Sequence, residues 1–189
     1  MNVFANPISA GLTLRSMTLD DLPQVYRIEL DSFTLPWPFS SYVFELTESN
    51  VSRCFVAATM DANAHKKILG MIVLYLIEDE AHVATFAVHK DFRHEGIGWR
   101  LLHYSLMEVV KFGATHAFLE VRATNHSAID LYDKFGFISV NVRKKYYADN
   151  GEDALLMNLD TLTIENLNSI ETQFNHSNPD QPLGGNHDA

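Results

Sequence analysis

Residues 87–100 have the sequence AVHKDFRHEGIGWR, and this stretch decides the fold more than any other part of the chain. A β-prone apolar run, 83–88, leads into a loop in which Arg93, Gly96 and Gly98 have the spacing R-x-x-G-x-G. Apolar residues then recur at helical spacing over 97–109. Such a loop can hold phosphates, because glycines admit close approach and the first N–H groups of a helix are unpaired. Glycines before a helix also form plain turns, so the spacing alone leaves both interpretations open.

The composition is that of one globular domain. The 189 residues are 47% hydrophobic and 20% charged, which suffices for a sizeable core. A formal net charge of −10 argues against a nucleic-acid-binding surface and is compatible with a basic partner or substrate. No apolar run reaches the roughly 18 residues that span a bilayer, and the N-terminus lacks the basic segment of a secretory signal. We therefore expect neither nucleic acid nor membrane as a partner.

The single cysteine, Cys54, cannot form an internal disulfide, which suits a reducing, cytoplasmic location. It lies in a strand-like run, 54–58, so a place in the core is favoured over a nucleophilic role. The nine histidines show neither HxxxH nor HExxH spacing, and with one cysteine the sequence predicts no metal site.

Hydrophobic periodicity and turn residues predict an alternating order of strands and helices. Strands are expected at 12–15, 53–59, 68–77, 81–88, 116–121, 138–147 and 154–159, and helices at 18–33, 40–48, 97–112 and 127–134. The early strands are linked by hairpins and the centre holds a β-α-β unit. The order therefore predicts an α/β (α+β) fold, a mixed sheet with helices on both faces.

Residues 161–189 form an acidic tail. From Asp160 onward there are five acidic residues and no lysine or arginine. This composition predicts disorder for most of the tail, with a short helix near 162–170, and a domain that ends near residue 160.

Several short motifs surround the glycine loop. They are Leu35-Pro36-Trp37, Leu119-Glu120-Val121-Arg122, Asn125, Ala128-Ile129-Asp130-Leu131-Tyr132, Phe135-Gly136-Phe137 and Tyr146-Tyr147 with Gly151-Glu152-Asp153-Ala154. Together with the element order, they resemble the GNAT superfamily of N-acetyltransferases, and within it the RimI-type branch that acetylates ribosomal-protein alanine N-termini. The resemblance covers roughly residues 12–159. It implies a GNAT domain over 11–160 and a mostly antiparallel mixed sheet that is splayed at the coenzyme site.

The resemblance also implies acetyl-CoA as co-substrate. The loop would bind the coenzyme pyrophosphate, and a backbone N–H near Val88 would meet the oxyanion. The coenzyme-binding residues implied are Phe86, Ala87, Val88, Arg93, His94, Glu95, Gly96, Ile97, Gly98, Asn125 and Tyr132. Asn125 could instead be a plain helix N-cap. Arg100, one turn into the helix, is expected to be a solvated charge.

Three residues are candidates for proton transfer. Glu120 ends an otherwise apolar strand, so a partly desolvated carboxylate is expected there, and the resemblance implies a general base acting through water. A salt bridge with Arg122 or a solvated strand end is the structural alternative. Tyr132 is the implied acid for the leaving thiolate, or else an aromatic core contact. His82 matches archaeal and eukaryotic relatives and is either a second base or a structural histidine.

The acceptor would lie against Trp37, Glu120, Tyr146 and Tyr147. Acids at 78–80 and 152–153 could attract a basic terminus, although charge runs are usually solvated. The activity that the resemblance implies is acetyl transfer to a protein N-terminal α-amine, foremost an alanine N-terminus of a ribosomal protein, by a monomer or weak dimer. A broad archaeal-type specificity, a small-molecule amine acceptor and a non-catalytic acyl-CoA-binding module remain open.

Overall fold

The computed structural model describes residues 11–60 and 63–178. Its elements are β1 (Thr13–Ser16), η1 (Leu19–Asp21), α1 (Leu22–Ser32), α2 (Phe39–Thr47), β2 (Ser52–Met60), β3 (Lys66–Ile77), β4 (Glu80–Val88), η2 (Lys90–Phe92), α3 (Ile97–Lys111), β5 (His116–Arg122), α4 (His126–Asp133), β6 (Ile138–Arg143), β7 (Ala154–Leu159) and α5 (Ile164–Ser177). None of the helices in this part of the chain is both long and apolar enough to cross a membrane.

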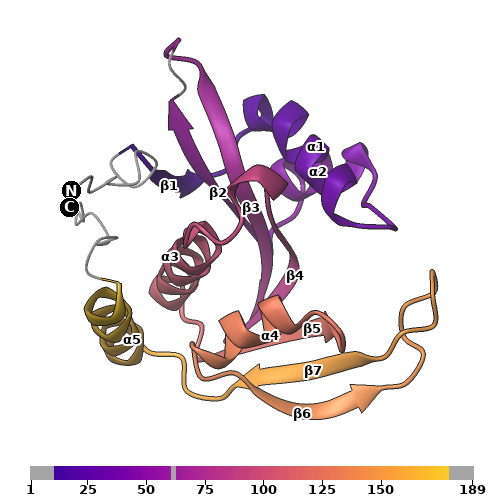
Figure 1. Cartoon of the computed structure of the whole chain (residues 1–189), viewed down its shortest axis with the longest axis vertical. Coiled ribbons are helices and arrows are strands. Elements are labelled where there is room, and N and C mark those ends of the chain that lie inside the picture. The colour runs from indigo at the N-terminus through magenta and orange to yellow at the C-terminus, as the bar shows by residue number, and fades with distance from the viewer. Residues whose placement is uncertain (1–10, 61–62, 179–189) are drawn as a thin grey trace, which may run out of the picture.

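The strands form one seven-stranded sheet in the order β1-β2-β3-β4-β5-β7-β6. All neighbouring strands are antiparallel except β4 and β5, which are parallel. Helices α1 and α2 cover one face, and α3 with α4 and α5 covers the other (Figure 1). The expected mixed sheet with helices on both faces is confirmed.

Side-chain alternation divides the core into two layers. On β3, Ile72 and Leu74 point into the core under α3, whereas Met71 and Val73 point into the core under α1. Successive side chains of a strand point to opposite faces, and a strand covered on both faces is apolar throughout. This explains the long apolar run of β3 and fixes the sheet between two helical layers.

The sheet splits between β4 and β5. The two strands pair only from Glu80 with His116 to Val83 with Leu119, although β4 continues to Val88 and β5 to Arg122. The register of β4 against β3 also shifts at this point, which is the mark of a β-bulge. Beyond the bulge, no strand of the described residues pairs with the β5 side of β4, so the predicted splay is present.

The tail differs from its prediction. Residues 164–177 form a 14-residue helix, α5, rather than a short helix followed by disorder; residues 179–189 lie outside the described part of the chain. Leu167 is buried, and the Phe174 ring stacks on Trp99 with centroids 4.0 Å apart. The predicted helix near 162–170 is present but is longer than expected, because Leu167, Ile170 and Phe174, at helical spacing, dock it on the core.

Candidate active site

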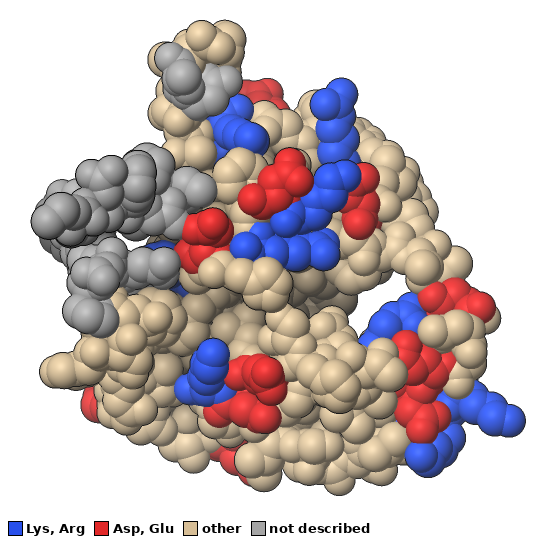
Figure 2. Space-filling view, in the orientation of Figure 1, with Lys and Arg blue, Asp and Glu red and all other residues tan. Residues whose placement is uncertain are grey.

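A cleft of about 1450 Å³ opens where β4 and β5 separate. It is lined by the end of α1 and the α1–α2 connection, the second half of β4, the end of β5, the start of α3, α4, the β6–β7 connection and α5. Figure 2 shows the surface hollowed between the half that carries α1 and α2 and the half that carries β5 to β7. The R-x-x-G-x-G loop and Glu120 therefore belong to one cavity.

The glycine loop turns the chain from β4 into α3. His94 and Gly96 have φ of +64° and +74°, and Gly96 is the N-cap of α3. A left-handed N-cap suits glycine, which has no Cβ to clash. Gly98 has no such backbone demand, and a Cβ there would meet Val88 Cγ2 at an ordinary 3.5 Å. The backbone N–H groups of the first turn of α3, which have no partner within the helix, therefore lie next to the gap beside β4.

The two arginines of this region have structural partners. Arg93 Nε donates to the Val88 carbonyl at 3.0 Å, and Nη2 lies 3.2 Å from Ser32 Oγ, so this side chain ties the end of β4 to α1. Arg100 is buried, and its burial lowers its pKa. Its Nη1 lies 3.4 Å from the Glu95 carbonyl. The expectation that Arg100 is a solvated charge was wrong, because α5 covers it.

Glu120 lines the cleft near the end of β5, and it points to the opposite face of the strand from the buried Leu119 and Val121, as the alternation predicted. Its side chain is 31% exposed and is ion-paired with Arg143 of β6, not with Arg122. The Tyr146 hydroxyl also bonds to Glu120, which raises the pKa of Tyr146. Glu120 is thus only partly exposed, and its ionic partner is Arg143 of β6.

Arg122 instead fastens the β6–β7 connection over the end of the cleft. Its Nη2 donates to Asp149 at 2.7 Å and lies 3.3 Å from Thr34 Oγ1, and its Nη1 donates to Glu152 at 3.1 Å. Its guanidinium also lies 3.8 Å from the centre of the Tyr147 ring. Arg122 therefore joins three segments that are distant in sequence.

The carboxylates of Glu152 and Asp153 in the β6–β7 connection already have hydrogen-bond partners within the protein. Hydrogen bonds from Thr124 lower the pKa of Glu152 to about 2. Asp153 accepts from Lys144 Nζ at 2.7 Å and from the Lys145 backbone at 2.9 Å. Both carboxylates hold the β6–β7 connection in place, as expected of structural rather than substrate-attracting charges.

Tyr132 lies on α4 and lines the cleft. Its burial raises its pKa, so the phenol keeps its proton at neutral pH, and its ring also packs against Phe137 at 5.7 Å. Asn125 caps α4, its side chain accepting from the Ala128 N–H at 3.2 Å, and it also lines the cleft. Tyr132 and Asn125 thus each make a structural contact, and each also lines the cleft.

His82 lies away from this site. It is in the paired half of β4, stacked on Phe118 with ring centroids 5.1 Å apart, and its Nε2 is 3.0 Å from Glu80 Oε2. It is not among the described residues that line the cleft, and neither is Tyr146. Trp37 and Tyr147 do line it, although Trp37 also packs on Tyr75.

A buried carboxylate behind the bulge was not singled out from the sequence. Glu29 of α1 is 1% exposed, and its burial raises its pKa. It accepts from the Trp37 backbone and from the Tyr42 hydroxyl, both at 2.8 Å, and from Thr85 of β4 at 3.5 Å. The signal was present, since Glu29 shares the helical spacing of apolar residues at 22, 25 and 28.

No group of three or more His, Cys, Asp or Glu side chains in the described ranges is arranged to hold a metal ion.

Known proteins match this fold and loop. A model of the acetyltransferase (GNAT) family matches residues 22–137. The [ribosomal protein bS18]-alanine N-acetyltransferase of Escherichia coli (strain K12) is 32% identical over 149 residues, which are 78% of this chain and 96% of that protein. The crystal structure of the E. coli ribosomal-protein-S18-alanine N-acetyltransferase superposes with a TM-score of 0.70 at 30% identity, covering 80% and 95% of the two chains. The N-alpha-acetyltransferase of Saccharolobus solfataricus is 35% identical over 156 residues, 77% of this chain and 90% of its own.

The chain belongs to the GNAT family of acetyltransferases. Within that family it is an acetyl-CoA-dependent N-acetyltransferase of the RimI type.

Proposed function

We propose that the protein acetylates the N-terminal α-amine of a polypeptide, with alanine as the preferred first residue. The observation that carries this proposal is the end of β4–β5 pairing at Val83 and Leu119, directly beside the glycine loop. The gap leaves backbone groups of β4 for the pantetheine arm of acetyl-CoA, which can pair like an added strand. The pyrophosphate would lie at the first turn of α3.

The acceptor would enter at the opposite end of the cleft. There Trp37, Leu35 and Tyr147 would offer apolar surface, and Glu120 lines the same cleft. A polypeptide end suits this entrance, because its terminal amine can reach inward while the chain stays outside. The E. coli relative named above is a ribosomal-protein-alanine acetyltransferase, and the Saccharolobus relative is an N-alpha-acetyltransferase. These names favour the α-amine as acceptor in this chain also.

The reaction is a direct attack in a ternary complex. A bond forms between the amine nitrogen and the thioester carbonyl carbon, and the carbon–sulfur bond breaks. Glu120 accepts the amine proton through water; an α-amine needs only a weak base, because its ordinary pKa is about 7.7–8.0. Tyr132 donates its phenolic proton to the departing thiolate and regains one from solvent. A backbone N–H near Val88 stabilises the oxyanion.

Two wider expectations belong to the same proposal. Residues 11–160 would carry the transferase itself, and the reaction would take place in the cytoplasm. Cys54 is free and buried, and burial raises the pKa of its thiol to about 12, which makes it unreactive, in agreement with a place in the core.

The test is acetyl transfer from acetyl-CoA to short peptides, with the modified site mapped by mass spectrometry. The panel contains free N-termini that begin with Ala, Ser, Met or Glu, and matched Nα-blocked peptides with an internal lysine. Transfer to the α-amine alone, fastest for Ala, is the expected result. A broad α-amine profile would replace alanine preference with archaeal-type specificity. Coenzyme binding without acetylation of any peptide would overturn the proposal and favour a small amine.

A further inference from the structure

The cleft continues past the glycine loop to the C-terminal helix. Ile170, Gln173, Phe174 and Ser177 of α5 line it, together with the C-cap residue Asn178. The first four are spaced i, i+3, i+4 and i+7, which places them on one face of the helix. The match to the family model ends at residue 137, so this wall of the cleft lies outside it.

Contacts with α3 fix the orientation of that face. Phe174 stacks on Trp99 with the ring planes 15° apart, and the Arg100 guanidinium lies 5.9 Å from the Phe174 ring centre. Nearer the N-terminus of α5, the Leu167 carbonyl lies 3.1 Å from His103 Nε2 in a buried contact. Trp99 and Arg100 belong to the first turn of α3, so α5 is seated against the turn that faces the cleft.

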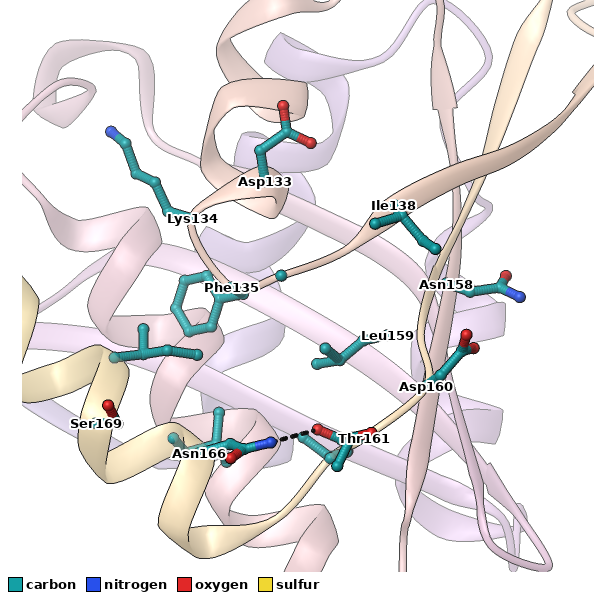
Figure 3. Close-up of a pocket in the computed structure, with 14 residues that line it drawn as sticks. Asp133, Lys134, Phe135, Ile138, Asn158, Leu159, Asp160, Thr161, Asn166 and Ser169 are labelled. Carbon is teal, nitrogen blue, oxygen red and sulfur yellow. Dashed lines mark hydrogen bonds between the residues drawn. The ribbon is translucent and has the colours of Figure 1, made fainter.

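Nearer its N-terminal end α5 borders a smaller pocket of about 490 Å³ (Figure 3), and Ile170 lines both this pocket and the cleft. Phe135 and Leu159 line this pocket, and the Asn166 amide hydrogen-bonds the Thr161 carbonyl beside it at 3.2 Å. Lys134 lines both the pocket and the cleft. A hollow thus lies between α5 and the end of the sheet, and α3 supplies the packing that positions the helix.

We propose that α5 is the binding wall for the adenosine 3′-phosphate half of the coenzyme, an inference that rests on the acetyl-CoA site proposed above. Coenzyme A is a linear molecule in which the pyrophosphate joins pantetheine to adenosine. With pantetheine beside β4 and the pyrophosphate at α3, the adenosine continues into the remaining stretch of cleft, between α4 and α5.

The side chains there suit that ligand. Phe174, backed by Trp99, offers an aromatic surface next to which a purine can stack. Gln173 and Ser177 carry an amide and a hydroxyl for the base and ribose, and Lys134 can meet a phosphate. The acidic tail thus contributes a segment of the coenzyme site, and the functional unit extends to about residue 178.

The test compares two ligands by calorimetry on the full chain: coenzyme A, and 4′-phosphopantetheine, which lacks adenosine. Phe174→Ala and the double variant Gln173→Ala/Ser177→Ala should each weaken coenzyme A binding about tenfold and leave 4′-phosphopantetheine binding unchanged. The double variant keeps the Phe174–Trp99 packing, so it remains informative if Phe174→Ala loosens the helix. Asn168→Ala is the matched control, because Asn168 is exposed on α5 and lines neither cavity.

Equal losses for both ligands would overturn the inference, since the effect would then act through α3. Unchanged affinity in all variants would also overturn it, and tighter coenzyme A binding would make α5 an obstruction instead. These binding results are independent of the acceptor. Absence of peptide acetylation by the wild type would contradict the proposed function. Equal changes in affinity for coenzyme A and for 4′-phosphopantetheine in the α5 variants would contradict only the role of α5.

Discussion

The Tyr42 hydroxyl donates a hydrogen bond of 2.8 Å to Glu29 Oε2 in the buried layer between α1 and the sheet. Trp37 and Thr85 contact the same carboxylate, so a residue of the proposed acceptor wall and a residue at the β4 bulge share one buried acceptor. The network therefore links the α1–α2 connection to β4 through the protein interior.

Tyr42→Phe should lower the free energy of unfolding by about 1–3 kcal/mol, because it leaves a buried carboxylate with one donor fewer. Urea unfolding measures this loss. Tyr26→Phe is the control: Tyr26 packs edge-on against Phe39 in the same region, and its substitution should change stability by less than about 0.5 kcal/mol. Equal effects of the two variants would refute the importance of the Glu29 contact.

Glu120→Gln and Tyr132→Phe should each lower kcat by about 10²–10⁴-fold, the range for loss of a positioned acid or base. Steady-state acetylation of the best peptide gives kcat, and calorimetry should give unchanged coenzyme affinity. Glu80→Gln removes a carboxylate of β4 that pairs with His82 outside the cleft, and it should keep wild-type turnover. Full turnover in the Glu120→Gln/Tyr132→Phe double variant would remove both residues from the mechanism.

The two loop glycines should respond differently to alanine. Gly96→Ala forces a Cβ into a left-handed N-cap and should cost about 1–2 kcal/mol of stability. Gly98→Ala has normal backbone geometry and ordinary contacts, so the protein should remain as stable as the wild type. Because Gly98 lines the cleft, its variant should nevertheless bind coenzyme A more weakly. Thermal melts and calorimetry separate these effects; a stable Gly96→Ala protein would contradict the conformational argument.

Glu152 should make the free energy of unfolding depend on pH in the acidic range. Its pKa is lowered to about 2 in the folded state, below the ordinary value of about 4.3. A group with a lowered folded pKa stabilises fully above its unfolded pKa, and that contribution is lost as pH falls through the folded value. The stability difference between wild type and Glu152→Gln should therefore shrink from pH 6 towards pH 2 in urea titrations. A difference that grows on acidification would show that the Arg122 and Thr124 contacts do not act through the ionised carboxylate.

Local patterns in the sequence predicted the elements that local physics controls. The glycine loop, the apolar stripe of α3 and the alternation around Glu120 were all legible, because each depends on neighbours within a few residues. The pairing of Glu120 with Arg143 was not, since it depends on the register of β5, β7 and β6. Register across three strands has no signature in any one of them.

The burial of Arg100 is a second feature that depends on a segment distant in sequence. Its place on α3 predicts exposure, but a helix more than sixty residues later in the sequence covers it. The net charge of the tail predicts disorder, whereas Leu167, Ile170 and Phe174 dock α5 on the core. Composition averages over such anchors, so it cannot reveal them.

The short seam between β4 and β5 has a consequence for cooperativity. Within the sheet of the described residues, only four residue pairs join the antiparallel half that ends at β4 to the half that begins at β5, and the chain crosses between them through α3. Such a division favours two sub-global opening units that exchange their amide hydrogens at different rates. A ligand lodged in the seam contacts both, so its binding free energy adds to the stability of each unit and couples their opening. A substrate bound in this seam would therefore also stabilise the sheet.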